Sequence, residues 1–409
     1  MPLSFLKRTY QKKLIPTPAL FGKGSVGPFI NTPPRDKSSL SQIYYATERQ
    51  KSNDVRFYNS KRDQVLHLGK ASVSLGPEGI TWEEIARQTL QQKRGCDMVV
   101  AVKDIHEFGH LWTASSNDEP QKEKERQQSA LFAEDINQKL KRSQKKDIYI
   151  FVPGFRVCFE DPLLVAKQFW HYLGYDGVFL AYCWPATPGL VTTYGHDVET
   201  TKYCSRNFRL LLEFLGTSTD VERIHIIGHS AGSRIVCSAL NELRLKYSHQ
   251  NEDQLRQSLK IGRVILIGAD FDRMLLKSYY RDHILDLLQN VTIYVSRKDR
   301  VLKIAGLLFK TPRLGVNAKN DISPAALKVL QTDPKINIID TSFAPGVNQE
   351  GGHMYLLTSP WVSSDMILLL QHGHNPARRN LQPREEGLYW GFGKDYGTKI
   401  TVPSDSKKD

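Results

Sequence analysis

The chain reads R-I-H-I-I-G-H-S-A-G-S-R-I-V-C over residues 223–237. A run of β-branched residues precedes the Gly-His-Ser-Ala-Gly turn and a helix-compatible run follows it, so the segment predicts strand, sharp turn and helix. Gly228 and Gly232 suit such a turn, because the strand and the helix crowd against a strained serine and leave no room for larger side chains. The pattern predicts a nucleophile elbow with Ser230 at its apex. A Gly/Ser turn without chemistry is the alternative.

Strand-like and helix-like segments alternate on both sides of this turn. Strand-like runs lie at 148–152, 178–183, 263–268, 291–296 and 335–340, and helices fit at 161–173, 197–215 and 273–289. Alternation of this kind is typical of a parallel sheet covered by helices. We therefore expect an α/β-hydrolase fold over residues 147–375, with a mostly parallel central sheet flanked by helices and an N-terminal mixed α/β extension.

The rest of the chain divides by composition into three further segments. Residues 1–40 form a basic arm rich in Pro and Gly, residues 41–146 an accessory region with a charged connector, and residues 376–409 a C-terminal tail. Within the accessory region, strands are expected at 43–47 and 98–102. A helix is expected to start at Thr81, which forms a capping box with Glu84. The connector over 117–146 is also expected to be helical.

Partners for Ser230 are expected in the chain order nucleophile, acid, histidine, each beyond the C-terminal end of a strand. Asp299 follows the strand expected at 291–296, and His353 ends a Gly-rich loop after the strand at 335–340. Asp270 and Asp272 compete with Asp299, but the acid usually follows the later strand. We expect neutral His353 to take the proton of Ser230, and Asp299 to fix the tautomer and stabilise the imidazolium.

An oxyanion hole needs two backbone N–H donors close to the nucleophile. The first is expected from Ala231, the residue after the serine, and the second from Phe155, because Gly154 lets the backbone approach the turn. Three residues are expected to contact substrate: Gly154, His229 in the elbow, and Trp184 at the pocket rim, where packing in the core is an equal alternative.

A second motif, H-E-x-x-H over residues 106–110, matches the zinc site of metalloproteases. That motif needs a helix to bring both histidines to one face, whereas here a β-branched run from Val99 to Val102 comes just before it. No third histidine stands at the spacing of the extended motif, because position 116 is Ser. We therefore expect a strand here, and neither a metal nor a cofactor.

Composition limits the classes of partner. The chain has 409 residues, a formal charge of +13 and seven basic residues against one acidic residue in the first 40. Aromatic residues do not interleave with the basic ones, so we expect no nucleic acid, and a solvated arm is favoured over contact with an anionic lipid surface. No apolar stretch is long enough for a membrane span, and the N-terminus does not resemble a signal peptide. Five scattered cysteines predict free thiols and a cytoplasmic protein. The sequence predicts no particular oligomeric state.

The chain resembles the α/β-hydrolase family catalogued as domain of unknown function 900, whose members are regarded as esterase/lipase-like enzymes. Matching segments lie at 150–155, 174–177, 226–233, 292–299 and 352–355, and residues 45–49 resemble the upstream signature of the family. The resemblance implies a Ser230–Asp299–His353 triad. The chain departs from many relatives at Pro153, where they have His, and at Ala231, where they have Met.

Together these features predict a serine hydrolase that cleaves carboxylic esters, of small molecules or lipids, through an acyl-enzyme intermediate. Acyl transfer to an acceptor other than water, and a hydrolase fold used as a binding module, are the alternatives. Residues 300–334 are the segment we expect to cap the site, because they lie between the acid and the base and carry three large apolar residues at 307–309.

Overall fold

The computed structural model describes residues 11–21, 27–33, 36–53, 57–111, 119–188, 193–316 and 324–401. Four basic residues of the predicted arm, and part of the predicted cap, therefore lie outside the described residues: Lys7, Arg8, Lys23, Arg35 and 317–323.

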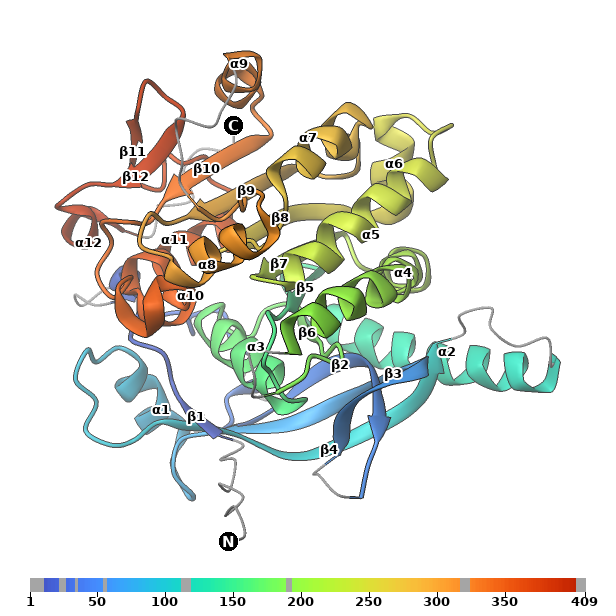
Figure 1. Cartoon of the computed structure of the whole chain (residues 1–409). Coiled ribbons are helices and arrows are strands. Elements are labelled where there is room, and N and C mark those ends of the chain that lie inside the picture. The colour runs from blue at the N-terminus through green and yellow to red at the C-terminus, as the bar shows by residue number, and fades with distance from the viewer. Residues whose placement is uncertain are drawn as a thin grey trace, which may run out of the picture.

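The described strands join into one twelve-stranded sheet. They are β1 (Gln11–Lys13), β2 (Leu40–Lys51), β3 (Tyr58–Leu75), β4 (Val99–Leu111), β5 (Asp147–Val152), β6 (Val178–Tyr182), β7 (Arg223–His229), β8 (Ile261–Ile267), β9 (Asn290–Val295), β10 (Ile336–Asp340), β11 (Leu381–Arg384) and β12 (Tyr389–Phe392). Their order is β1-β4-β3-β2-β6-β5-β7-β8-β9-β10-β12-β11 (Figure 1). Strands β5 to β10 are parallel, as the alternating pattern predicted, and this confirms the expected hydrolase-type sheet.

Helices cover both faces of the parallel strands (Figure 1). They are α3 (Glu160–Tyr172), α4 (Tyr194–Ser218), α5 (Gly232–Lys246), α6 (Glu252–Leu259), α7 (Arg273–Arg281), α8 (Arg300–Phe309), α9 (Pro324–Thr332), α10 (Tyr355–Thr358) and α11 (Pro360–His372). On β5, Ile148 and Ile150 belong to one hydrophobic core, whereas Tyr149 and Phe151 belong to the other. Burial on both faces explains why these strands read as continuous apolar runs rather than as alternating ones.

The N-terminal region extends the same sheet with antiparallel strands. Strand β2 pairs in parallel with β6, and β3 pairs antiparallel with β2 on one side and with β4 on the other. Helix α1 (Trp82–Thr89) begins at Thr81, whose side chain accepts the Glu84 N–H, and helix α2 (Glu119–Leu140) forms the connector. The long strand β3 was not predicted, because its first half alternates between charged and polar residues without an apolar run.

The described part of the basic arm lies against the body of the protein. Strand β1 pairs with β4, and Leu14, Ile15, Leu20 and Phe21 are buried in the core that also contains α3 and α11. Burial of these four apolar side chains stabilises the contact. This part of the arm is therefore a packed segment of the fold.

The C-terminal segment, expected only as a tail, adds two strands and the short helix α12 (Tyr396–Lys399). Strand β12 pairs with β10, and β11 pairs with β12 at the edge of the sheet. The buried Arg379 makes an ion pair with Asp365 of α11, and Asp365 also accepts a hydrogen bond from Tyr294 of β9. A buried, paired charge of this kind fixes the C-terminal segment to the helix and the strand beside it.

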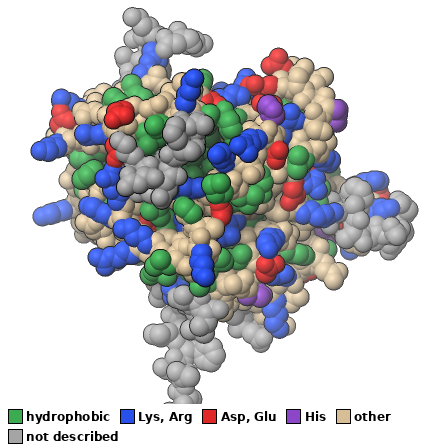
Figure 2. All heavy atoms as spheres, turned by 45° about the horizontal axis from the view of Figure 1, so that its top comes forward, with side chains coloured by type: hydrophobic (Ala, Val, Ile, Leu, Met, Phe, Trp, Pro, Cys, Tyr) green, Lys and Arg blue, Asp and Glu red, His purple; other side chains and the backbone are tan. Residues whose placement is uncertain are grey.

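The face drawn in Figure 2 carries side chains of both charges. Figure 2 shows Lys and Arg side chains spread among hydrophobic and acidic ones on the face drawn there. None of the described helices is long and apolar enough to cross a membrane. All five cysteines are described, and none of them forms a disulfide.

Candidate active site

Ser230 occupies the tight turn between β7 and α5. Its backbone has φ 51°, a left-handed conformation that is strained for a residue with a side chain. Strand β8 and the loop after it hold this conformation, because Ser230 donates its N–H to Ile267 O at 3.0 Å and accepts the Asp270 N–H at 3.1 Å. A Cβ at Gly232 would lie 2.4 Å from Val152 O, so glycine is required where α5 leaves the turn.

The structure brings together the three residues singled out from the sequence. Ser230 Oγ lies 2.8 Å from His353 Nε2, and His353 Nδ1 lies 2.7 Å from Asp299 Oδ2. All three are buried, with 3%, 6% and 0% of Ser230, His353 and Asp299 exposed. When Nδ1–H donates to the Asp299 carboxylate, Nε2 is left as an acceptor for the serine proton, which is the arrangement that proton transfer requires.

Asp299, rather than the competing aspartates, meets His353. Its Oδ1 accepts the Leu302 N–H at 2.9 Å as the N-cap of α8, while its Oδ2 faces the imidazole. Asp270 instead makes an ion pair with Arg234 of α5, and Asp272 caps α7. Capping fixes the carboxylate to a rigid helix end, so its free oxygen is held in place for His353.

The loop after β5 passes directly over the nucleophile. A Cβ at Gly154 would lie 2.8 Å from Ser230 Cβ, so only glycine permits this approach. Within the described part of the chain, no hydrogen bond uses the N–H of Phe155 or of Ala231. Unused backbone donors next to a buried serine are what an oxyanion hole provides.

Trp184 differs from its expected role at the pocket rim. It is fully buried and is not among the residues that line the cavity at Ser230, and its indole N–H donates to Pro153 O at 2.8 Å. The expectation that it contacts substrate is therefore corrected. The side chain instead positions the loop that carries Gly154 and Phe155.

A mostly apolar cavity opens at Ser230. Ring and aliphatic side chains predominate among its lining residues, which are Lys12, Phe151, Pro153, Gly154, Phe155, Val157, Asp161, Pro162, Val165, His229, Ser230, His353, Met354, Leu356 and Leu357. Lys12 comes from the N-terminal arm and pairs with Asp161 of α3 at 2.9 Å, a contribution that the sequence did not reveal. No described residue of 300–334 lines this cavity, so the described part of that segment does not form the expected cap over it.

His229 lines the cavity and stays uncharged. Its Nε2 donates to the carbonyl oxygen of His353 at 3.3 Å. Burial lowers the pKa of His229 to about 3. His229 therefore does not compete with His353 for the role of base. Its hydrogen bond instead fixes the backbone of His353.

Arg49 is a positioning residue that sequence reasoning from the site itself missed. It lies in the 45–49 segment, is 1% exposed, and donates hydrogen bonds to the carbonyl oxygens of Cys183, Val157 and Ala186. These acceptors belong to the loops that follow β5 and β6. One guanidinium with several donors can hold two loops at once, which a lysine could not do.

The parallel sheet and the elbow after β7 define an α/β-hydrolase. The chain belongs to the family described as "Alpha/beta hydrolase of unknown function (DUF900)", which matches residues 128–369. Among solved structures it is similar to a "putative cell surface hydrolase" from Lactobacillus plantarum WCFS1 and to a "Lipase-esterase related protein" from Clostridium acetobutylicum ATCC 824. Each is 10% identical over 56% of this chain, which aligns with 92% and 94% of those proteins at TM-scores of 0.30 and 0.26. No curated protein matches the sequence.

Proposed function

We propose that the protein is a serine hydrolase that cleaves carboxylic esters through an acyl-enzyme intermediate. The observation that carries the proposal is the continuous hydrogen-bonded chain from Asp299 through His353 to Ser230, at 2.7 and 2.8 Å, beside an apolar cavity. A hydroxyl is a weak nucleophile by itself, and an adjacent base held by a third group is the usual means of activating it.

In the first half-reaction, Ser230 Oγ attacks the ester carbonyl carbon while its proton moves to His353 Nε2. The carbonyl oxygen becomes an oxyanion, which the N–H groups of Phe155 and Ala231 stabilise. Asp299 stabilises the imidazolium. The carbon–oxygen bond to the alcohol then breaks, the imidazolium proton passes to the departing alkoxide, and the acyl group remains on Ser230.

In the second half-reaction, a water molecule attacks the acyl carbon while His353 takes one of its protons. The new tetrahedral intermediate uses the same two N–H donors. Its collapse breaks the bond to Ser230 Oγ, which recovers its proton from the imidazolium, and the carboxylic acid leaves. The chemistry needs no cofactor, and every proton passes through His353 Nε2.

The lining of the cavity favours an uncharged, apolar acyl group. Val165, Leu356 and Leu357 offer hydrophobic surface, whereas the charged lining residues Lys12 and Asp161 neutralise each other. An ionised acyl group would lose its hydration without gaining a free partner. We therefore expect p-nitrophenyl butyrate to be cleaved at least about tenfold faster, in kcat/KM, than p-nitrophenyl hemisuccinate.

The test is hydrolysis of a panel of p-nitrophenyl esters from acetate to octanoate. We expect Ser230→Ala to lower kcat/KM at least about 1,000-fold. Ser233→Ala is the matched control, because Ser233 is a buried serine near the same turn whose hydroxyl donates to Gly228 O. Wild-type protein that is folded but inactive on the whole panel, or Ser230→Ala with unchanged activity, contradicts the proposal.

A further inference from the structure

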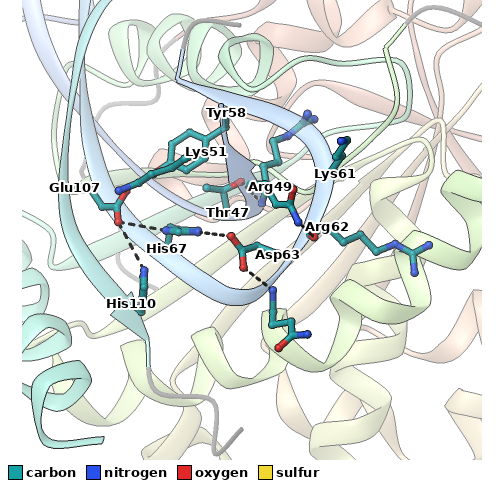
Figure 3. A network of polar contacts seen from close by, with 12 residues as sticks. Thr47, Arg49, Lys51, Tyr58, Lys61, Arg62, Asp63, His67, Glu107 and His110 are labelled. Atoms are coloured by element: carbon teal, nitrogen blue, oxygen red, sulfur yellow. Dashed lines mark hydrogen bonds and ion pairs between the residues drawn. The ribbon is translucent and has the colours of Figure 1, made fainter. Parts of the chain in front are cut away.

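A second group of reactive side chains lies in the antiparallel half of the sheet (Figure 3). None of the three residues described next lines the cavity at Ser230. His67 of β3 and Glu107 and His110 of β4 each direct one ligand-type atom to a common point, and these three atoms lie within 4.8 Å of one another. Glu107 Oε1 is 3.2 Å from His67 Nδ1 and 3.9 Å from His110 Nε2.

A β-bulge creates this convergence. Leu68 pairs with Gly109 and Gly69 pairs with Glu107, so β4 has one extra residue, Phe108, opposite β3. In a regular strand, residues three apart point to opposite faces. The extra residue brings Glu107 and His110 to the same face, which is the kind of re-aiming that bulges produce beside functional sites.

The same bulge separates the two histidines of the H-E-x-x-H motif. His110 packs edge-on against His67, with ring centroids 4.7 Å apart, whereas His106 packs against Phe108 at 4.9 Å. The strand expected from the sequence is confirmed, and the metalloprotease arrangement is absent from it. A different trio, drawn from two strands, takes its place.

We propose that His67, Glu107 and His110 bind a divalent first-row metal ion, of which Zn²⁺ is the best match. Two imidazoles and one carboxylate with a fourth position open to water are a ligand set that zinc prefers. Bonds of about 2.0–2.1 Å in a tetrahedron place neighbouring ligand atoms about 3.3 Å apart. The Glu107–His67 separation of 3.2 Å already fits, whereas His110 Nε2, 3.9 Å from Glu107 Oε1, must move closer to complete the set.

Each proposed ligand has an outer partner of the type that supports metal ligands. The other ring nitrogen of His67 faces Asp63 at 3.2 Å, and the other ring nitrogen of His110 lies 3.9 Å from Glu125 of α2. A hydrogen-bonded carboxylate behind an imidazole fixes its orientation and raises its basicity as a ligand. Asp63 is close enough to His67 for this, whereas Glu125 lies beyond hydrogen-bond distance of His110. The second oxygen of Glu107 meets Lys51 Nζ at 2.9 Å and the hydroxyl of Tyr58.

The charges of the cluster also call for a cation. The cluster is rich in carboxylates, because Asp63, Glu107 and Glu125 lie beside its two imidazoles and Lys51 pairs with Glu107. The gap of 3.9 Å between His110 Nε2 and Glu107 Oε1 is too long for a hydrogen bond, so no proton bridges the pair. A bound dication would fill this gap and offset carboxylate charge.

Such an ion links β3 to β4 through its ligands, and reaches β2 and α2 through Lys51 and Glu125. We therefore assign it a structural role as a clip on the antiparallel half of the sheet. His67 and Glu107 have side chains only 5% and 14% exposed, whereas His110 is 29% exposed, which leaves a route for the ion.

The test uses the full chain without an affinity tag, stripped with EDTA and titrated with Zn²⁺ by calorimetry, with bound metal counted by mass spectrometry. We expect one ion per wild-type chain, and at least tenfold weaker binding for His67→Ala and for Glu107→Gln. His106→Ala is the matched control, because it removes the exposed histidine of the same motif, and we expect it to bind as the wild type does.

Three results overturn the proposal: no zinc bound to the wild type, equal binding by all four proteins, or a loss in His106→Ala as large as in the other variants. A crystal grown with Zn²⁺ gives a test that needs no variant. We expect an anomalous peak within about 2.3 Å of the two imidazole nitrogens and the Glu107 oxygen. A peak elsewhere, or none, contradicts the proposal.

Discussion

The two halves of the sheet build their sites in different ways. In the parallel half, Ser230, Asp299 and His353 all lie beyond the C-terminal ends of strands, where the topology brings loops together. In the antiparallel half, His67, Glu107 and His110 lie within strands, and a register shift decides whether they meet. A site at strand ends follows from the order of the elements, whereas a site within strands follows from a register that the sequence does not display.

The two motifs of the chain make the same point. The Gly-His-Ser-Ala-Gly turn lies between a strand and a helix, as a nucleophile elbow requires, and Ser230 Oγ lies 2.8 Å from His353 Nε2. The H-E-x-x-H motif occurs in strand β4, whereas it needs a helix to bring its two histidines together as metal ligands. The predictions below are arranged to test this contrast, from the largest effect to the smallest.

The largest effect is expected for Asp299→Asn in the parallel half. An asparagine still caps α8, but its amide group donates toward His353 Nδ1 and favours the tautomer whose Nε2 cannot accept the serine proton. We expect kcat for the best ester to fall about 10⁴-fold while the melting temperature changes little.

The matched control is Asp272→Asn, which changes an N-cap aspartate of the neighbouring helix α7 in the same way. Similar losses of activity in both variants would mean that capping, rather than contact with His353, is what Asp299 supplies. Steady-state kinetics and thermal unfolding on the same samples separate the two.

In the antiparallel half, Gly69→Ala is expected to lower stability without changing the chemistry. A Cβ at Gly69 would lie 2.2 Å from the ring of the fully buried Tyr45, which has no space into which to move. We expect the free energy of unfolding to fall by about 1–3 kcal/mol, as overpacked cores do. Below the unfolding transition kcat is expected to stay within twofold of wild type, and a large loss would show that the two halves are coupled.

The third prediction concerns the pH dependence of stability. Burial lowers the pKa of His229 to about 3, against about 6.5 in the unfolded chain, so between these values only the unfolded state binds the proton. This contribution to stability is complete above pH 6.5 and is lost as the pH falls toward 3, at up to about 1.4 kcal/mol per pH unit.

We therefore expect His229→Gln to flatten the dependence of unfolding free energy on pH between 4 and 6, measured by urea denaturation. The exposed His249→Gln corrects for general effects of the substitution. An unchanged slope in His229→Gln would contradict the assignment of a buried, neutral imidazole at this position.

The smallest effect is expected for Trp184→Phe, which removes the hydrogen bond to Pro153 O. Loss of one buried hydrogen bond lowers the free energy of unfolding by about 1 kcal/mol, and the freed loop is expected to lower kcat up to about tenfold. Trp170→Phe is the control, because its indole donates in the same way to Asp176 O, at 3.1 Å. Equal kinetic losses in both variants would show that Trp184 does not position the loop.

Much of the parallel half could be predicted from the sequence, because its strands are short apolar runs buried on both faces. Ser230, Asp299 and His353 could be found since chain order and strand ends locate them without any knowledge of packing. Lys12 could not, because its place at the cavity depends on the arm pairing with β4 and on Asp161, 149 positions later in the sequence.

The antiparallel half was predicted less completely, for a physical reason. The first half of β3 is mostly polar, and its backbone pairs with the neighbouring strands. No apolar alternation in the segment itself therefore predicts a strand. The unpaired Phe108, which aligns Glu107 with His110, has no signature in the residues around it. The position of Trp184 could not be decided from the sequence, because a tryptophan that follows a strand can lie either at the rim of a pocket or buried beneath a loop.

The central claim is that Ser230 is an activated nucleophile, and its most direct test is labelling with a fluorophosphonate, read as intact mass and mapped by peptide digestion. The account predicts one adduct per wild-type chain, on the peptide that contains Ser230, and none on Ser230→Ala. No adduct on folded wild-type protein, or an adduct that persists in Ser230→Ala, would contradict it.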